Sequence, residues 1–224
     1  MHDPVLAWLL GPAQACGDEA AFVAGLAAEL DAGGFAVDRV WLGYLRPHPL
    51  VAGVGATWHR ERGAFVVTLP FDRRRDLPGP QGPIAEAMAS GGPVRVRMAD
   101  YERGALNLQS SLWDEGFVEQ VVIGCTWSGG FAVITFTTKR PGGFTDVEVE
   151  RLAELRGAIS LHAELIDRRA SLEVITTTYL GRDAGRRILD GALHRGDGET
   201  ITAAIWFSDL RGFTALSERL PLAA

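Results

Sequence analysis

A short stretch near the end of the chain, "FSDLRGFTALSE" at 207–218, holds the residues best suited to chemistry. The preceding "TITAAIWF" is rich in β-branched and aromatic residues and predicts a strand, which places Asp209 at a strand end. A carboxylate in that place can bind a divalent cation. The "RGFT" that follows predicts a turn into a helix, whose first backbone N–H groups can face phosphate oxygens. Together these features predict half of a site for a metal ion and a triphosphate.

The same stretch resembles the start of the catalytic domain of class III adenylate/guanylate cyclases. The matching segment of that family reads phenylalanine, any residue, aspartate, isoleucine or leucine, any residue, then Gly-Phe-Thr. The resemblance implies that Asp209 is a metal-binding aspartate and that Leu210 contacts a metal through its backbone carbonyl. It also implies that the triphosphate is bound by the amides of Gly212, Phe213 and Thr214. In the complete family site, two Mg²⁺ or Mn²⁺ ions and ATP or GTP bind at the interface of two catalytic domains.

The family also needs residues that this sequence does not contain after the matching stretch. They are a second metal-binding aspartate, base-selecting residues, and an asparagine–arginine pair for the transition state. We therefore expect the 224-residue chain to be a fragment cut inside the catalytic domain, and to be inactive alone. Upstream, "YLGRDAGRRIL" at 179–189 resembles the short transducing element that precedes such domains.

Composition sets limits on the rest of the chain. Hydrophobic residues make up 47% of it, which is typical of a globular protein, and the net charge of −6 argues against a general affinity for nucleic acid or anionic membranes. The two cysteines, Cys16 and Cys125, form neither a disulfide framework nor a metal quartet. No apolar run approaches the ~20 residues needed to span a bilayer. We expect a soluble, cytoplasmic protein.

Helical and strand patterns alternate through the first two thirds of the chain. An acidic start, apolar residues at helical spacing and a Gly-Gly stop predict a helix from Asp18. Strand patterns occupy 35–45, 51–58, 64–69, 93–98, 117–127 and 131–138, and further helices are expected at 83–90 and 105–115. Ser128-Gly129-Gly130 predicts a tight hairpin. The predicted fold class is α+β, with one mostly antiparallel sheet and flanking helices.

This order of elements, with "RPGGFTDVEVERL" at 140–152, resembles a GAF domain over residues 18–165. The resemblance implies a small-molecule pocket, which we expect between the sheet and the 71–116 segment. Five residues sit in elements that flank such a pocket: Trp58, His59, Trp113, Cys125 and Trp127. Ordinary core packing for the tryptophans and the cysteine, and a hydrogen-bonded surface position for the histidine, are the alternative interpretations. The effector stays open between a cyclic nucleotide, a tetrapyrrole, a small aromatic and no ligand.

A long helix is expected from Thr145 to about Tyr179, because this span has no proline and one glycine, Gly157. Two apolar stripes follow it. The first can pack on the sheet and consists of Leu152, Leu155, Ile159, His162 and Ile166. The second can pair with a twin helix in a parallel homodimer and consists of Ala158, Leu161, Leu165, Leu172, Ile175 and Tyr179. The alternative is a single helix that lies wholly on its own domain.

These patterns divide the chain into a GAF-like sensor domain with N-terminal helices at 1–165, a signalling helix and transducer at 166–198, and the start of a cyclase domain at 199–224. The favoured hypothesis is the sensor and linker region of a cyclase that makes cyclic AMP or cyclic GMP. The alternative is a non-catalytic dimeric sensor or interaction module. A small-molecule effector, ATP or GTP, and a second copy of the chain are the expected partners.

Overall fold

The computed structural model describes residues 3–45, 51–72, 82–100, 107–191, 194, 200 and 202–218. Its centre is a six-stranded sheet in the order β3-β2-β1-β6-β5-β4, in which all neighbouring strands are antiparallel. The strands are β1 (Arg39–Leu45), β2 (Val51–His59), β3 (Gly63–Pro70), β4 (Val94–Arg97), β5 (Glu119–Trp127) and β6 (Gly130–Thr138). The predicted fold class is confirmed.

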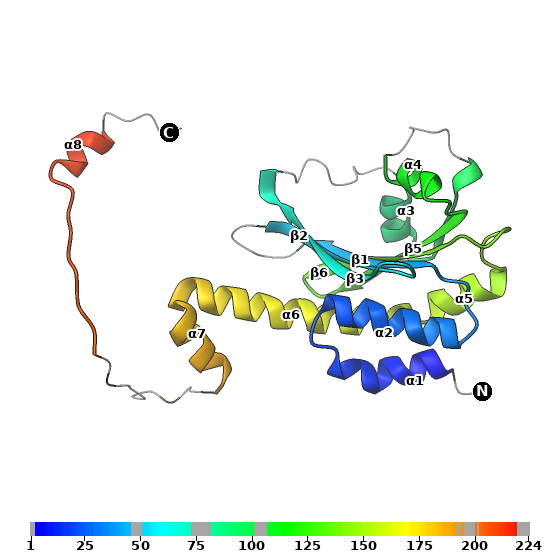
Figure 1. The fold of residues 1–224 in the computed structure, drawn as a ribbon, viewed down its shortest axis with the longest axis horizontal. Helices are drawn as coiled ribbons and strands as arrows, with labels where there is room; N and C mark the ends of the chain where they lie inside the picture. Colours follow the sequence, from blue (N-terminus) through cyan, green and yellow to red (C-terminus); the bar gives the residue numbers. More distant parts are fainter. Residues whose placement is uncertain are drawn as a thin grey trace.

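Helices cover both faces of this sheet (Figure 1). One face, here called the α2/α6 face, is covered by α2 (Glu19–Ala32) and α6 (Arg156–Leu180), and α1 (Pro4–Leu10) packs on these two helices (Figure 1). The 3₁₀ turn η1 (Pro12–Ala15) lies between α1 and α2, and α5 (Asp146–Glu154) precedes α6. The other, the α3 face, carries α3 (Pro83–Ser90) and α4 (Asn107–Asp114), with a short 3₁₀ turn, η3 (Met98–Asp100), after β4. Two further helices, α7 (Arg182–Leu189) and α8 (Phe213–Ser217), follow α6.

Alternation along the strands produces the main core. Side chains such as Leu42, Ile123 and Phe136 point to the α2/α6 face and are completely or almost completely buried there. His162 of α6 joins this core, because its ring stacks on Phe22 of α2 and its Nε2 hydrogen-bonds the carbonyl of Leu9 in α1. One histidine thus connects three helices beneath the sheet.

Local signals account for most element boundaries. Thr145 caps α5 in a capping box, in which its hydroxyl accepts from the Glu148 amide and its own amide donates to the Glu148 carboxylate. Ser128 and Gly129 form the predicted two-residue hairpin loop, with Gly129 at a φ of 87°. The first strand starts later than predicted, because the Phe35 amide completes the end of α2 by donating to the Leu30 carbonyl.

The predicted long helix is divided in two. At Leu155 the backbone N–H is shared between the carbonyls of Arg151 and Ala153, so the turn tightens and α6 starts afresh at Arg156. The first apolar stripe is buried as expected, since Leu155, Ile159 and Ile166 all belong to the core. The expected domain boundary at 165/166 falls inside α6.

Beyond the sheet, α7 folds back on α6 (Figure 1). Gly185 permits the contact, because a Cβ there would lie 2.9 Å from the Thr177 Cα. The strand predicted at "TITAAIWF" does not form within the described residues 202–207. Its apolar side chains Ile205, Trp206 and Phe207 are 80–91% exposed, since no described strand pairs with it. Within the described residues, no helix combines the length and the apolar character that crossing a bilayer would require.

The Glu119 carboxylate, fully buried at the start of β5, holds the turn that leads into α5. Its Oε1 accepts from Arg95 Nε at 2.8 Å, and its Oε2 accepts from the Phe144 amide at 2.6 Å. Arg95 in turn donates to the Phe144 carbonyl at 2.6 Å, and hydrogen bonding to Glu119 raises the pKa of Arg95. Gly143, at a φ of 76°, leaves the room that the carboxylate occupies. The junction between the sheet and the exit helices therefore depends on one charge.

Glu119→Gln should lower the free energy of unfolding by about 2–4 kcal/mol, because it keeps the size of the side chain but removes the buried counter-charge of Arg95, which then keeps the exposed Asp146 as its acidic partner. Urea denaturation measures the change. Glu150→Gln, an exposed site on α5, is the matched control and should stay within about 0.5 kcal/mol of the wild-type value. Equal stability of the two variants would contradict the structural role of Glu119.

Candidate functional site

A cavity of about 420 Å³ lies on the α3 face, between the sheet and α3, and is here called the sheet cavity. Its described lining comes from β1, β2, β3, β6 and α3. The residues are Trp41, Gly43, Tyr44, Leu45, Gly53, Val54, Gly55, Val67, Thr68, Leu69, Ile84, Ala85, Met88, Phe131 and Val133. This volume lies within the range of small-molecule sites.

Glycines make the floor of the sheet cavity. Strand register places Gly55, Gly43, Val133 and Gly124 in one row across β2, β1, β6 and β5. The indole of Trp41 fills the space that side chains at Gly43 and Gly55 would take. A Cβ added to Gly43 would lie 2.2 Å from the six-membered ring, and a Cβ added to Gly55 would lie 2.8 Å from Nε1. One face of the indole therefore rests on the sheet backbone.

The opposite wall is α3, whose position on the sheet also depends on a glycine. A Cβ on Gly124 would lie 2.8 Å from Met88 Sδ and 3.0 Å from the Ala87 carbonyl, so that α3 lies directly on β5 there. Ala87 is fully buried in this contact, whereas Ile84 and Met88 line the sheet cavity. The cavity thus lies between the sheet and a part of the predicted 71–116 segment.

The structure places the five candidate pocket residues elsewhere. Trp58, Cys125 and Trp127 pack against the core on the α2/α6 face, behind the sheet as seen from the cavity. His59 and Trp113 lie near Phe117, with the His59 ring at 5.7 Å and 80° to that of Phe117. None of the five lines the sheet cavity. Burial raises the pKa of the Cys125 thiol, with a hydrogen bond to Ser160 opposing it, so the thiol is poorly suited as a nucleophile.

The residue that sequence reasoning missed is Trp41. A usable signal was present, because Trp41 and Gly43 are two apart on one strand and must share a face. The glycines of β2, Gly53 and Gly55, repeat the same spacing. Tertiary pairing sets which strands are neighbours, so the sequence alone did not show that the glycines of β1 and β2 lie side by side.

A polar row continues the α3 face beyond the sheet cavity. Register aligns His59, Arg39, Thr137 and Gln120 across four strands. Burial lowers the pKa of Arg39 to about 10, an effect that the charge of Glu115 opposes. Within the part of the chain that the structure describes, the buried polar atoms His59 Nε2, Gln120 Nε2 and Thr137 Oγ1 have no hydrogen-bond partner. This row does not line the sheet cavity.

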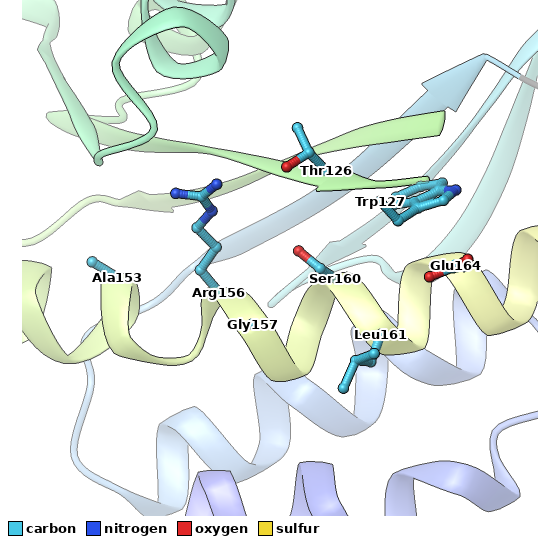
Figure 2. A pocket seen from close by; sticks show the side chains of 8 residues that line it. All are labelled: Thr126, Trp127, Ala153, Arg156, Gly157, Ser160, Leu161 and Glu164. Carbon is cyan, nitrogen blue, oxygen red and sulfur yellow. The ribbon is translucent and has the colours of Figure 1, made fainter. Parts of the chain in front are cut away.

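A second hollow, the α6 groove, lies between the end of β5 and α6 (Figure 2). Trp127 lines it, together with Arg156, Ser160 and Glu164. Its two charged side chains already have partners, since Arg156 donates to the Gly91 carbonyl and Glu164 accepts from Arg168 at 2.7 Å. Each charged side chain of the described lining therefore already makes a hydrogen bond within the chain.

The cyclase-like residues lie apart from the sheet (Figure 1). Asp209 and Leu210 are exposed in an extended segment, and Gly212, at a φ of 77°, turns the chain into α8, whose first residues are Phe213 and Thr214. The Phe213 amide donates to the Leu210 carbonyl at 3.1 Å. Among the described residues no group of three or more His, Cys, Asp or Glu side chains gathers as a metal-ligand set. Asp209 alone does not make a two-ion site, and its metal-binding role stays a prediction.

The second apolar stripe of α6 is largely uncovered in the single chain. Leu161, Leu172, Ile175 and Tyr179 are 65%, 58%, 48% and 83% exposed, and Leu165 is half-buried. Figure 2 shows Leu161 on the side of α6 that faces away from β5. The stripe is thus available for a partner.

Solved structures share the architecture. A phycoerythrobilin-bound GAF domain from a cyanobacterial phytochrome is similar with a TM-score of 0.50 and 14% identity, over 74% of this chain and 96% of that chain. The GAF domain of a phosphoenolpyruvate-protein phosphotransferase from Coxiella burnetii gives 0.47 and 16%, over 74% and 93%. The free methionine-R-sulfoxide reductase of Neisseria meningitidis gives 0.47 and 20%, over 74% and 89%.

The chain has a GAF-like fold. At these identities the likeness shows the fold alone. No protein-family profile and no curated protein matches the sequence. The GAF resemblance is therefore confirmed as to fold, whereas the cyclase resemblance of 199–224 rests on the sequence.

Gly43→Ala should displace the Trp41 indole, because the new methyl group and the ring cannot occupy the same space. We expect a loss of about 1–3 kcal/mol in unfolding free energy and a changed near-ultraviolet circular dichroism signal. Gly92→Ala is the control, since a Cβ there meets open space. An unchanged near-ultraviolet signal in Gly43→Ala would show that the indole does not lie on this glycine.

Proposed function

We propose that the chain is the sensor and linker region of a class III adenylate or guanylate cyclase, in which the GAF-like domain regulates the conversion of ATP or GTP to cyclic nucleotide and diphosphate. The observation that carries the proposal is the order of parts in one chain. A GAF-like domain with a cavity precedes the long helix α6, and the cyclase-like stretch at 207–218 follows. Asp209 would supply one carboxylate to a Mg²⁺ or Mn²⁺ ion, whose charge offsets that of the triphosphate.

Contacts around α3 support a route for regulation. Arg156, the first residue of α6, donates to the carbonyl of Gly91, the residue that ends α3. The guanidinium lies at the negative end of the α3 dipole, which favours this contact. Because α3 also forms a wall of the sheet cavity, a ligand that shifts α3 would shift the root of α6 through Arg156.

The uncovered stripe of α6 supports a homodimer. Side chains such as Leu172 and Ile175 are at helical spacing, and pairing with the same stripe of a second copy would bury them. Two copies in parallel would bring two cyclase-like stretches to the same end of the assembly. That arrangement suits a catalytic site formed between two domains.

The cyclase proposal is tested on a form of the protein that also carries the second metal-binding aspartate. We expect it to form cyclic nucleotide from ATP or GTP with Mg²⁺ or Mn²⁺, and Asp209→Ala should lower turnover by at least about 100-fold by removing a metal ligand. Asp190→Ala, at an exposed position after α7, is the matched control and should keep full activity. The 224-residue chain should show no turnover. Full activity of Asp209→Ala, or turnover by the 224-residue chain, would contradict this assignment.

The dimer is tested by placing charges on the stripe. Leu172→Glu combined with Ile175→Glu should convert the dimer to a monomer, because the paired carboxylates cannot be buried without partners. Sedimentation equilibrium measures the mass, and circular dichroism checks that the domain stays folded. Thr178→Glu, at an exposed position outside the stripe, should leave the dimer intact. A monomeric wild-type chain at high concentration would rule the homodimer out.

A further inference from the structure

The indole of Trp41 offers a flat apolar surface to the sheet cavity. One face rests on the backbone of Gly43 and Gly55, as the clash positions of their missing Cβ atoms show. Trp41 is also a lining residue, so its indole borders the cavity as well. Aromatic rings stack favourably on such a face in an offset arrangement. An indole fixed on glycines is a stacking surface that does not need to move when a ring binds.

The other residues that line the sheet cavity also suit an aromatic ligand. Val133 continues the floor next to Gly43, and Ile84 and Met88 line the cavity from α3. The methionine thioether makes favourable contacts with aromatic rings and adapts to their outline. Val67 and Phe131 line the cavity too and are 55% and 39% exposed, so that the cavity opens to solvent on their side. An aromatic ligand can enter the cavity from this side without unfolding of the elements that line it.

The absence of charge in the described lining disfavours anionic ligands. None of the described lining residues carries a charge, and the side chains among them with polar atoms are Thr68, Tyr44 and Trp41, whose Nε1–H is a donor. The Tyr44 hydroxyl donates to Glu19 of α2 on the other face of the sheet. A carboxylate or phosphate buried here would lose its hydration without gaining a counter-ion from the described lining, which is costly.

We propose that the sheet cavity binds a planar, uncharged aromatic molecule of about two fused rings, stacked on Trp41. The cavity of about 420 Å³ has room for such a molecule. The inference names the effector class of the proposed sensor and in that sense rests on it. Of the effectors left open by the sequence, it selects the small aromatic over the cyclic nucleotide and the tetrapyrrole.

Three probes of similar outline separate the features of the proposed ligand. 2-Naphthol is planar and uncharged, 2-naphthoate is planar and anionic, and decahydro-2-naphthol keeps the skeleton without a planar ring. Isothermal titration calorimetry on the 224-residue chain should give a Kd below about 100 µM for 2-naphthol, a value reachable for a well-packed ligand of this size. The other two probes should bind at least about tenfold more weakly.

Substitutions then locate the site. Trp41→Leu should weaken 2-naphthol binding about tenfold, and Trp41→Phe, which keeps a flat ring, should restore most of it. Trp206→Leu is the matched control and should bind like wild type, because Trp206 is 87% exposed and lies far along the chain. Should Trp41→Leu not fold, Val67→Trp serves instead: it adds bulk at a half-exposed lining position and should block binding.

The inference would be overturned by the absence of 2-naphthol binding at 1 mM, or by binding that Trp41→Leu and Val67→Trp leave unchanged. Equal or tighter binding of 2-naphthoate would also overturn it, since an anion would then have a partner in the site. The measurement needs no catalysis, so it stands apart from the proposed function. Binding that does not alter cyclase turnover would count against regulation by this domain and leave the ligand class in place.

Discussion

The buried carboxylate of Glu119 is the interaction on which the rest of the structure depends. It lies where β4, β5 and the 140–145 turn meet, and it accepts from Arg95 and from the Phe144 amide. A charge inside a core is stable only when it is paired and hydrogen-bonded, so the surrounding groups have little freedom. That fixes the direction in which the chain leaves the sheet. The start of α5 is held from the same side, because Arg95 also donates to Asp146, its first residue, at 2.5 Å.

The two faces of the sheet meet different physical demands. The middle of the α2/α6 face is filled by large aliphatic and aromatic side chains, and the α6 groove lies at its edge, between the end of β5 and α6. The α3 face carries glycines and short side chains in the middle, which is what opens the sheet cavity. Tryptophans recur beside glycines in this protein: the indole of Trp8 lies against Gly25, and that of Trp127 against Gly130. In each pair the indole fills the space that a side chain on the glycine would take.

Much of this fold could be predicted from local patterns. Runs of strand-forming residues located all six strands of the sheet, and the acidic start at Asp18 and the N-cap at Thr145 located two helices, because those signals act over a few residues. The same kind of run also predicted the strand at 200–207, which does not form within the described residues 202–207. The N-terminal helices expected in the 1–165 domain were given no bounds before α2, and α1, whose cap at Asp3 stands next to Pro4, is the first of them. The long-range features were harder. Trp41 can lie over both glycines only because β1 and β2 pair with Gly43 opposite Gly55. The sequence of one strand does not determine which strand pairs with it or in which register. Of the tryptophans predicted to flank the pocket, Trp58 and Trp127 pack against the core of the α2/α6 face, and Trp113 packs beside Phe117.

One consequence of α6 is mechanical. The part of the helix beyond Ile166, the last core residue of its buried stripe, is about 21 Å long at 1.5 Å per residue. Because the root is held between the core and Gly91, a rotation there acts as it would on a lever arm. A tilt of about 5° moves the tip by roughly 2 Å, which is enough to separate or join two hydrogen-bonding groups. Because α7 packs back along α6, it stiffens this part of the helix. A small tilt at the start of α6 therefore becomes a larger displacement of its C-terminal end.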